Sequence, residues 1–504
     1  MRRHQARLIN DANRKWWTLG AMCFALFMIM LDNTVVNVAL PSIQSDLGAS
    51  IQGLEWTVNG YTLSFAVLLA TGGRLGDIFG RRRMFLGGVI LFTIASATAG
   101  LAPDTTSLVL SRVVQGVGAA FMMPGTLSII TDAFPAHERG KAIGTWAGVS
   151  ALALAIGPVV GGFLVEHVSW RAIFYMNLPV GAGAVFAALF AVRESRDETV
   201  GRDVDLPGVA LLTAGLTALV LALVEGNSWG WGSAEIVAML VGSVVLLAAF
   251  VMVELRIHAP MVEFSLFASR NFIGAVTVAF IVSFAMLGMF FFLTLYMQNI
   301  LGFTPLEAGL RFLPTTLVIM VVAPLSGRLA DRIGPRWPIT IGLSLVTLAL
   351  ADFTTIDLGT TFADLWVPFV LMGIGIAMTM SPMSAAAMNA VAPAKAGIAS
   401  GILSMFRMVG GTFGVAATGA LFQAEAGADA LSPAGVAGQA GRESFIGALA
   451  SSMRLSAAVA LAGAVVAATL IRGSHRLAAS ADEDSIGLGA ATPAGEMAAA
   501  RAEG

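Results

Sequence analysis

The ten residues GRLGDIFGRR, at positions 73–82, return as GRLADRIGPR at positions 327–336, and six of the ten positions are identical. The second copy lies about half a chain length after the first, and each copy follows a long apolar stretch. The chain between the copies holds several more apolar stretches. The sequence therefore predicts two related halves, in which each apolar stretch of the first half has a counterpart in the second.

The composition shows what kind of protein these halves form. Hydrophobic residues make up 57% of the 504 residues and charged residues only 12%, and the mean hydropathy is +0.82. Soluble domains carry about 25% charged residues, so a soluble chain of this size would lack the polar residues to cover its surface. This excludes a soluble enzyme, a disordered protein and a collagen-like fibre. The single cysteine, Cys23, excludes a disulfide framework and a cysteine-rich metal site.

Fourteen apolar stretches are long enough to cross a bilayer as helices, which takes about 20 residues each. Their length and continuity are unlike the alternating segments of an outer-membrane barrel. The sequence therefore predicts an all-α polytopic membrane protein with 14 transmembrane helices. The expected spans are 16–40, 54–73, 84–102, 107–131, 142–165, 172–192, 206–225, 234–255, 271–299, 306–326, 338–356, 364–388, 397–422 and 446–471.

The basic residues predict the orientation. Of the 29 Lys and Arg residues, 23 lie before the first stretch, after the last, or in every second connection. The positive-inside rule assigns that side to the cytoplasm, so both termini are expected there. We expect a multi-pass protein of the plasma (inner) membrane. The first apolar run is too long for a signal peptide and no small-residue cleavage site follows it.

The repeat predicts the domain organisation, because span n of the first half corresponds to span n+8. Two parallel six-helix bundles are expected, with two inserted linker helices and a substrate site between the bundles near the midplane. The expected parts are a cytoplasmic N-terminus at 1–15, a first bundle at 16–199, the inserted spans at 200–265, a second bundle at 266–472 and a disordered cytoplasmic tail at 473–504.

Five motifs occur in order on the expected spans. They are LDNTVVNVALP at 31–41, the loop motif at 73–82, Arg112 with Gln115, Gly116 and Gly118, Gly148 with GPVVGG at 157–162, and SWRAIFYMNLPVG at 169–181. With them, the chain resembles the major facilitator superfamily, specifically its fourteen-span drug:proton antiporter branch, over nearly all of residues 16–472. Gly76 and Ile78 depart from the Ala and Arg usual in the loop motif.

Asp32 and Arg112 are the predicted proton-coupling pair. Eight residues separate Asp32 from the end of its span, which places it about 12 Å below the outer surface, and Arg112 lies at a similar depth. An ionisable group at such a depth is a functional candidate by default. The resemblance implies that this half carries the proton step. The alternative is a static pair in which Asp32 bonds neighbouring backbone.

The two loop motifs are predicted to form a conformational latch, meaning an ion-pair cluster that is stable in one conformer and broken in the other. We expect it on the cytoplasmic loops between helices, and the alternative is a solvated charge cluster that sets topology. Its expected residues are Gly73, Asp77, Gly80, Arg81, Arg82, Asp331 and Arg332.

The glycines of the fifth span have two interpretations. By resemblance they form the antiporter motif, a tight and bent contact that resists leakage. Plain helix packing through small residues is the alternative and a full physical account. The residues are Gly148, Gly157, Pro158, Gly161 and Gly162.

The substrate cavity is predicted from polar residues on spans near the centre. Arg407 lies nearly mid-membrane with no partner evident in the sequence; Arg311 and Arg454 also lie within spans, and Arg311 has Glu307 one turn earlier. No acidic residue lies near the middle of a second-half span, so we expect proton chemistry in the first half only. The expected cavity residues are Asn33, Asn37, Tyr61, Gln115, Tyr296, Gln298 and Arg407.

These features together predict a proton-coupled secondary exporter, an antiporter of hydrophobic drugs or antibiotics working by alternating access. The proton gradient is the expected energy source, with no cofactor and no metal. The expected partners are a small hydrophobic or amphipathic substrate, protons and the lipid bilayer, with no nucleic acid, and the protein is expected to be monomeric.

Two alternatives remain open. One keeps the fold but changes the cargo to an amino acid, a siderophore, a single antibiotic or a lipid. The other is a membrane enzyme or sensor on a transporter scaffold. The sequence has no HExxH and no P-loop motif, so we predict that it is not an enzyme and not an ATP-driven pump.

Overall fold

The computed structural model describes residues 13–196, 205–257, 260, 262–391, 396–427, 436 and 438–472. Within these ranges the regular secondary structure is helical throughout, and no residue is in a strand. The predicted all-α fold is therefore confirmed. The expected N-terminal segment up to residue 12 and the expected tail at 473–504 lie outside the described residues.

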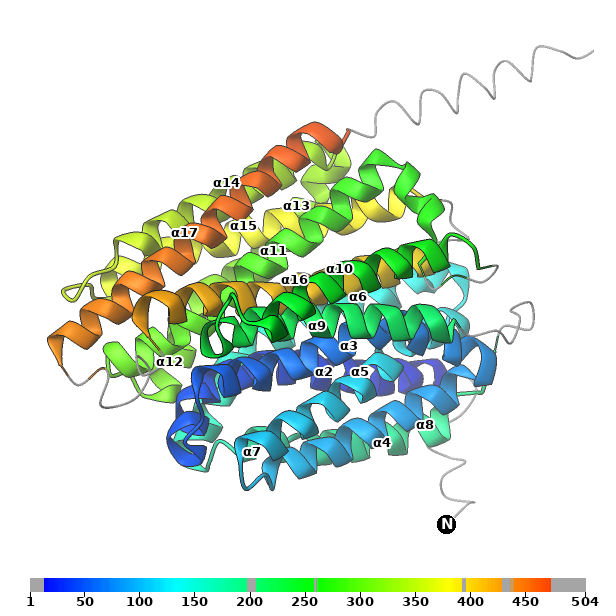
Figure 1. Cartoon of the computed structure of the whole chain (residues 1–504). Coiled ribbons are helices and arrows are strands. Elements are labelled where there is room, and N and C mark those ends of the chain that lie inside the picture. Colours follow the sequence, from blue (N-terminus) through cyan, green and yellow to red (C-terminus); the bar gives the residue numbers. More distant parts are fainter. Residues whose placement is uncertain are drawn as a thin grey trace, which may run out of the picture.

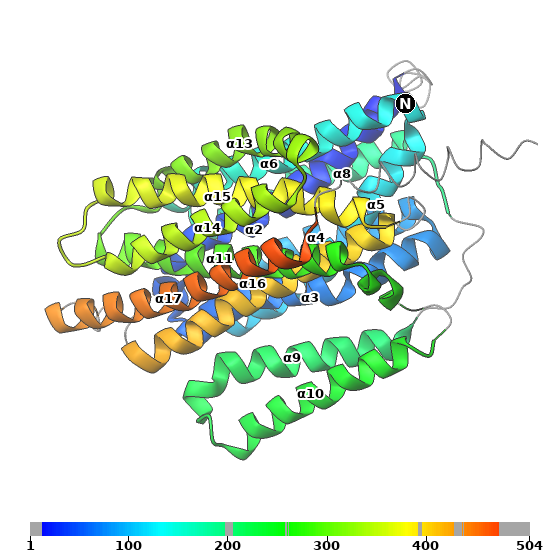
Figure 2. The ribbon, with the colours of Figure 1, turned by 90° about the horizontal axis from the view of Figure 1, so that it is seen from above.

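The first bundle consists of the helices that precede the long connection after residue 191 (Figure 1). They are α2 (Arg14–Leu47), α3 (Ile51–Phe79), α4 (Arg81–Gly100), α5 (Thr105–Ala133), α6 (Ala136–His167), α7 (Ala172–Tyr175) and α8 (Asn177–Ala191). Two further helices, α9 (Leu206–Trp229) and α10 (Ala234–Glu254), form a hairpin. Figure 2 shows this hairpin standing beside the main body of helices.

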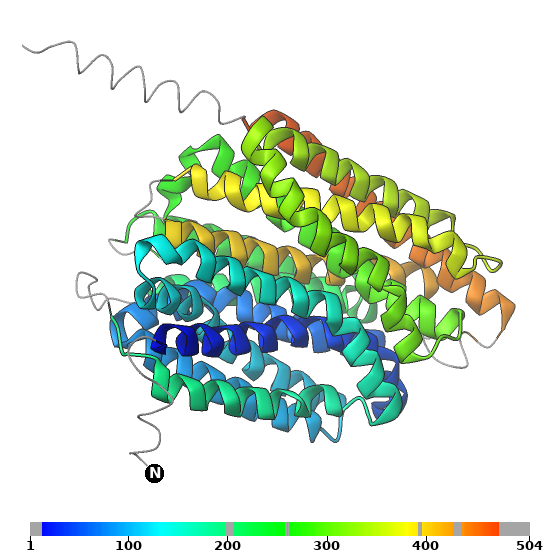
Figure 3. The ribbon, with the colours of Figure 1, turned by 180° about the vertical axis from the view of Figure 1, so that it is seen from behind.

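The second bundle follows a short 3-10 helix, η1 (Phe264–Ala268). Its members are α11 (Arg270–Leu295) with η2 (Tyr296–Ile300), α12 (Pro305–Arg311), α13 (Leu313–Ile333), α14 (Arg336–Asp352) with η3 (Phe353–Thr355), α15 (Phe362–Asn389), α16 (Ala396–Ala426) and α17 (Gln439–Leu470). Seen from behind in Figure 3, the long helices of both bundles run side by side.

Every one of the fourteen predicted spans falls on helix. Among the described residues, twelve helical segments are long and apolar enough to cross a membrane, or thirteen if α3, bent at Ala70, counts as one span. The remaining predicted span, 142–165, lies in α6, which is 32 residues long. The chain is thus a multi-pass membrane protein, and the count of fourteen spans stays a prediction.

Helix packing repeats between the two bundles. In the first, α5 packs against α3 and α4, and α2 packs against α6 and α8. In the second, α15 packs against α13 and α14, and α11 packs against α16 and α17. Each helix of the second bundle therefore packs against the counterparts of the helices that its own counterpart contacts in the first bundle, when span n is matched to span n+8. The α9–α10 hairpin packs against α3 and α16, at the side where the two bundles meet.

The two ends of the bundles need names, because the functional residues differ between them. The start of α2 and the end of α17 lie at the same end, which we call the terminal end (Figure 1). The turn between α2 and α3, at Gly48 to Ser50, lies at the other end, which we call the far end.

The repeated motif lies mostly in helix, which corrects the expectation that it forms a loop. Helix α3 runs through Gly73 and Asp77 to Phe79, and only Gly80 separates it from α4. In the second copy, α13 runs through Asp331 and Arg332 to Ile333 before Gly334. In each copy the helix continues up to the last glycine of the motif, which is Gly80 in the first copy and Gly334 in the second. Gly80 and Gly334 adopt φ values of 109° and 82°, which only glycine takes readily, so each ends its helix there.

Candidate functional site

Asp32 lies at the centre of a buried polar network inside the first bundle. It comes from α2, while Arg112 and Gln115 come from α5, and none of the three is more than 1% exposed. Arg112 Nη1 donates to Asp32 Oδ2, and Gln115 Nε2 donates to Asp32 Oδ1 at 2.8 Å. The structure therefore brings the two predicted proton-coupling residues into one ion pair, with Gln115 beside them.

Two residues that sequence reasoning missed complete this network. Asn177, the first residue of α8, donates through Nδ2 to Asp32 Oδ1 at 3.1 Å and to Ser96 Oγ of α4 at 2.9 Å. Gln115 Nε2 also donates to Ser96 Oγ, at 3.2 Å. Asn177 lies within the motif at 169–181, which was the available signal. Ser96 is a neutral residue in an apolar helix, and nothing in the sequence distinguishes it.

Arg112 is held by contacts on every side of its guanidinium. Besides Asp32, its Nη1 donates to Gln115 Oε1 at 2.8 Å and its Nε donates to the carbonyl oxygen of Thr57 on α3 at 3.0 Å. The guanidinium carbon lies 4.3 Å from the centre of the Tyr61 ring. A buried ion pair is tolerated when further hydrogen bonds satisfy its atoms, and here both Asp32 oxygens and the Nε and Nη1 of Arg112 have partners.

This arrangement can couple a proton to a change in packing. A proton on Asp32 would remove the charge that balances Arg112, and Arg112 also contacts α3 through Thr57 and Tyr61. A cation left buried without its counter-charge is costly, so the contacts among α2, α3 and α5 would have to change.

The latch residues predicted from the first copy of the motif lie together at the terminal end of the first bundle. Arg81 donates through Nε to Asp77 Oδ1 at 2.9 Å and through Nη1 to Asp132 Oδ2 of α5 at 2.6 Å. The backbone nitrogen of Arg82 donates to Glu194 Oε1 at 3.0 Å, after the end of α8. The cluster therefore ties α3, α4, α5 and the segment after α8 together.

Asp132 and Glu194 were not expected from the sequence, because both lie far along the chain from the motif. Gly73 packs against Pro124 of α5. In the second copy of the motif, Asp331 and Arg332 are exposed. The Asp77–Arg81–Asp132 cluster described above lies at the first copy.

The glycines of α6 pack against α2 of the same bundle and against α12 of the second bundle. Gly157 and Gly161 lie against Thr34 and Val35 of α2, so closely that a Cβ at either position would meet them at 3.1 Å or less. Gly162 faces the second bundle, where a Cβ would lie 2.5 Å from the carbonyl oxygen of Pro305.

The remaining residues of the predicted motif, Pro158 and Gly148, differ in their surroundings. Gly309 of α12 packs against the carbonyl group of Pro158. Gly148 is exposed and would meet nothing within 4 Å. Close packing thus accounts physically for Gly157, Pro158, Gly161 and Gly162, and does not account for Gly148.

The predicted cavity residues do not form a single site. Tyr61 and Gln115 belong to the Asp32 network, and both are fully buried. Asn37 Nδ2 donates to the backbone oxygen of Asn33 within α2, at 3.3 Å. Gln298 Nε2 donates to the backbone oxygen of Val38 at 2.9 Å, from one bundle to the other.

The remaining candidates lie in the second bundle. Tyr296 is fully buried, and its hydroxyl has no partner among the described residues. Arg407 Nε is likewise buried without a partner in the described part of the chain. The Glu307 carboxylate does not pair with Arg311, because it accepts a hydrogen bond from the backbone nitrogen of Thr304. Arg311 instead donates to the backbone oxygen of Glu307 at 3.1 Å and stacks on Phe303. Arg454 is exposed.

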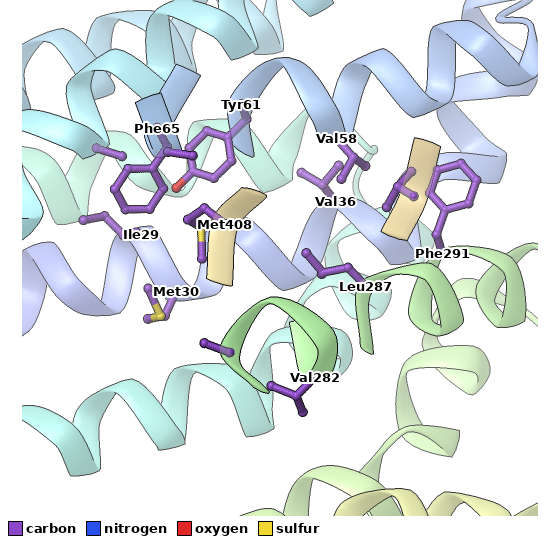
Figure 4. Packing of buried hydrophobic residues seen from close by; sticks show 14 of the residues in the cluster. Ile29, Met30, Val36, Val58, Tyr61, Phe65, Val282, Leu287, Phe291 and Met408 are labelled. Carbon is purple, nitrogen blue, oxygen red and sulfur yellow. The ribbon is translucent and has the colours of Figure 1, made fainter. Parts of the chain in front are cut away.

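Several polar contacts between the bundles lie from the middle toward the far end. Among the described residues, Thr412 Oγ1 donates to Thr62 Oγ1 at 2.8 Å, and Gln52 Nε2 donates to Gln423 Oε1 at 2.8 Å. The backbone nitrogen of Leu306 donates to Glu166 Oε2 at 3.1 Å. Figure 4 shows the apolar side chains gathered among α2, α3, α11 and α16, including Met30, Tyr61, Leu287 and Met408.

Comparison with known proteins identifies relatives along most of the chain. The family model described as Major Facilitator Superfamily matches residues 22–415. The tetracenomycin C resistance and export protein of Streptomyces glaucescens is 36% identical over 416 residues, which are 82% of this chain and 77% of that protein. The multidrug resistance protein Stp of Mycobacterium tuberculosis (strain CDC 1551 / Oshkosh) is 40% identical over 408 residues, 81% of this chain and 76% of Stp.

Two more similarities extend the comparison. The puromycin resistance protein pur8 of Streptomyces alboniger is 40% identical over 410 residues, 80% of this chain and 81% of that protein. Among solved structures, a bacterial homolog of the human lysosomal transporter Spinster, in an inward-facing and occupied conformation, superposes with a TM-score of 0.64. The match covers 90% of this chain and 96% of that one at 18% identity, so it shows a shared fold.

Proposed function

We propose that the chain, which belongs to the major facilitator superfamily of transporters, is a proton-coupled exporter of hydrophobic drugs or antibiotics. As a member of this family it is a transporter and not an enzyme. The relatives named for antibiotic resistance and export support the cargo class. One observation carries the proton coupling: Asp32 is a buried carboxylate whose charge is balanced by Arg112.

The proposed cycle alternates access between the two ends of the bundles. With the basic terminal end at the cytoplasm, the far end faces the outside of the plasma membrane. The contacts that join the bundles toward the far end support a state in which substrate enters from the terminal end. Proton binding at Asp32 and substrate binding then favour different states, which is the requirement for exchange.

The substrate would bind between the bundles, near the apolar side chains of α2, α3, α11 and α16. Met30 and Met408 suit varied hydrophobic ligands because their side chains are flexible and polarisable. Arg407 adds a cation for a polar or anionic group of the substrate. The proton gradient is the proposed energy source, with no cofactor, and the exporter is proposed to act as a monomer.

Two structural roles complete the proposal. The Asp77–Arg81–Asp132 cluster is the conformational latch at the terminal end, and it would break when the helices around it separate. The α6 glycines, with Gly157 and Gly162 foremost, form the tight antiporter contact with α2 and α12, which would block a leak of protons during exchange.

The test is substrate-induced proton movement in energised inside-out membrane vesicles, read with a pH-sensitive dye. Asp32→Asn should abolish this movement. Asp46→Asn is the matched control, because Asp46 lies at the far end of the same helix and pairs with Arg171 outside the buried network. Normal coupled efflux in Asp32→Asn would contradict the role of Asp32.

Growth of a pump-deleted host across a panel of toxic compounds addresses the cargo. Cells that express the chain should tolerate several hydrophobic antibiotics better than cells that do not. Tolerance of a single compound, or of none, would favour the dedicated exporter of one solute over the drug exporter.

A further inference from the structure

Glu55 is a buried carboxyl group at the seam between the two bundles, outside the Asp32 network. It lies in the second turn of α3 at the far end and is 0% exposed. Its carboxylate lies against Gly419 of α16, where a Cβ would overlap it. Gln423 Nε2, one turn further along α16, donates to Glu55 Oε1 at 3.1 Å. The carboxyl group therefore sits between one helix of each bundle.

The surroundings of Glu55 contain no cation that balances a negative charge. In the described part of the chain, neither Arg nor Lys forms an ion pair with it, and its Oε2 has no hydrogen-bond partner. From α9, Glu225 adds a second acidic group. From α5, Arg112 is committed to Asp32. On α16, Glu425 is exposed. A charged carboxylate in this position is costly, whereas a protonated carboxyl group is not.

The position of Glu55 links this cost to opening of the seam. Separation of α3 from α16 at the far end would lift the carboxyl group off Gly419 and expose it to water. The closed seam thus accommodates the protonated acid, and the open seam accommodates the carboxylate.

We propose that Glu55 is a second proton-binding site, whose protonation closes the seam between α3 and α16 at the far end and whose deprotonation opens it. This inference rests on the proposed proton-coupled export, in which the far end faces the outside. A proton taken up from outside would then favour closure after the substrate has left. Because the two states bind the proton differently, the ratio of closed to open seam changes by up to about tenfold per pH unit.

The test measures the width of the seam directly. Spin labels are attached at Ser45→Cys and Ala424→Cys, two exposed positions at the far end on different bundles, with Cys23→Ser removing the native thiol. Distance distributions are recorded in lipid nanodiscs across a pH series. A short distance should dominate at low pH, and a longer one should grow as the pH rises.

Substitutions at Glu55 provide the decisive comparison. Glu55→Gln, which mimics the protonated acid, should hold the short distance at every pH, and Glu55→Asp should restore the dependence on pH. Asp104→Asn is the matched control, because Asp104 is a far-end carboxylate that caps α5 away from the seam, and the dependence should persist.

Two outcomes would overturn the inference: a Glu55→Gln protein whose distances change with pH as in the parent, or a parent protein with one distance at all pH values. Proton movement in vesicles separates this failure from failure of the proposed function. If the parent protein moves no protons while its distances still depend on pH through Glu55, the exporter proposal fails and the site stands. If Glu55→Gln changes nothing while Asp32→Asn stops proton movement, only the site fails.

Discussion

Removal of Arg112 should destabilise the protein strongly, and removal of its partner as well should restore most of the loss. Arg112→Met takes away a guanidinium that bonds Asp32, Gln115 and the Thr57 carbonyl. Asp32 would keep two donors, Gln115 Nε2 and Asn177 Nδ2, but would lose its only described ion-pair partner. We therefore expect Asp32 to keep part of its hydrogen bonding in Arg112→Met, while its charge stays buried without a counter-charge.

The magnitude follows from the burial of the pair. Breaking a buried ion pair by removing one partner costs about 3–5 kcal/mol, because the remaining charge stays out of water. The two retained amide donors place Arg112→Met toward the lower part of that range. The double variant Arg112→Met with Asp32→Leu leaves no buried charge of the pair. Replacement of both partners by apolar groups is nearly neutral, so the loss in free energy of unfolding should fall to about 1 kcal/mol.

Unfolding of the purified protein in detergent, followed by tryptophan fluorescence, provides the assay. The four proteins of the double-mutant cycle are compared under one condition, because only the difference isolates the pair. A loss in the double variant equal to the sum of the two single losses would refute the reasoning, since it would show that Asp32 and Arg112 contribute independently. The transport assay is not needed for this result.

Three further predictions follow from close contacts. Gly162→Val should push α6 away from Pro305 and lower stability by about 1–3 kcal/mol, measured by thermal unfolding, whereas Gly148→Ala, with open space around it, should not. Gly80→Ala should destabilise the turn by about 1–3 kcal/mol, because φ is 109° there and a Cβ would meet Glu194 at 2.5 Å; an unchanged melting curve would refute this. Asp132→Asn should slow transport without weakening substrate binding if Arg81 is part of a latch, so weaker binding at an unchanged maximal rate would contradict that role.

The two carboxyl groups at the centre of the proposals differ in how they are balanced. Asp32 lies within one bundle and has Arg112 as its counter-charge, so its protonation leaves a buried cation behind. Glu55 lies between the bundles without a counter-charge, so its protonation relieves a cost. The first would change packing inside the bundle, and the second would change whether the bundles touch at the far end.

Several features of the site could be predicted from the sequence because they involve charge in an apolar context. Asp32 and Arg112 stand out as ionisable residues deep in predicted spans, and in the structure they form an ion pair, while their role in proton coupling stays a prediction. The sequence predicts Asp77 and Arg81 in one charge cluster but places them on a loop, whereas in the structure Asp77 lies in α3 and Arg81 begins α4. The repeat follows the end of a predicted span, so the sequence places it on a loop, whereas the helix continues to the first glycine with positive φ.

The sequence alone determined that this is a many-helix membrane protein with two related halves, because a membrane span needs a long apolar run and a repeat is visible in the letters. Only the tertiary structure decided which polar groups meet. Ser96 and Asn177 join Asp32, and Glu55 meets Gln423 across 368 residues of chain. The physical reason is that such contacts depend on how each helix is rotated against its neighbours, and close packing of small residues sets that rotation.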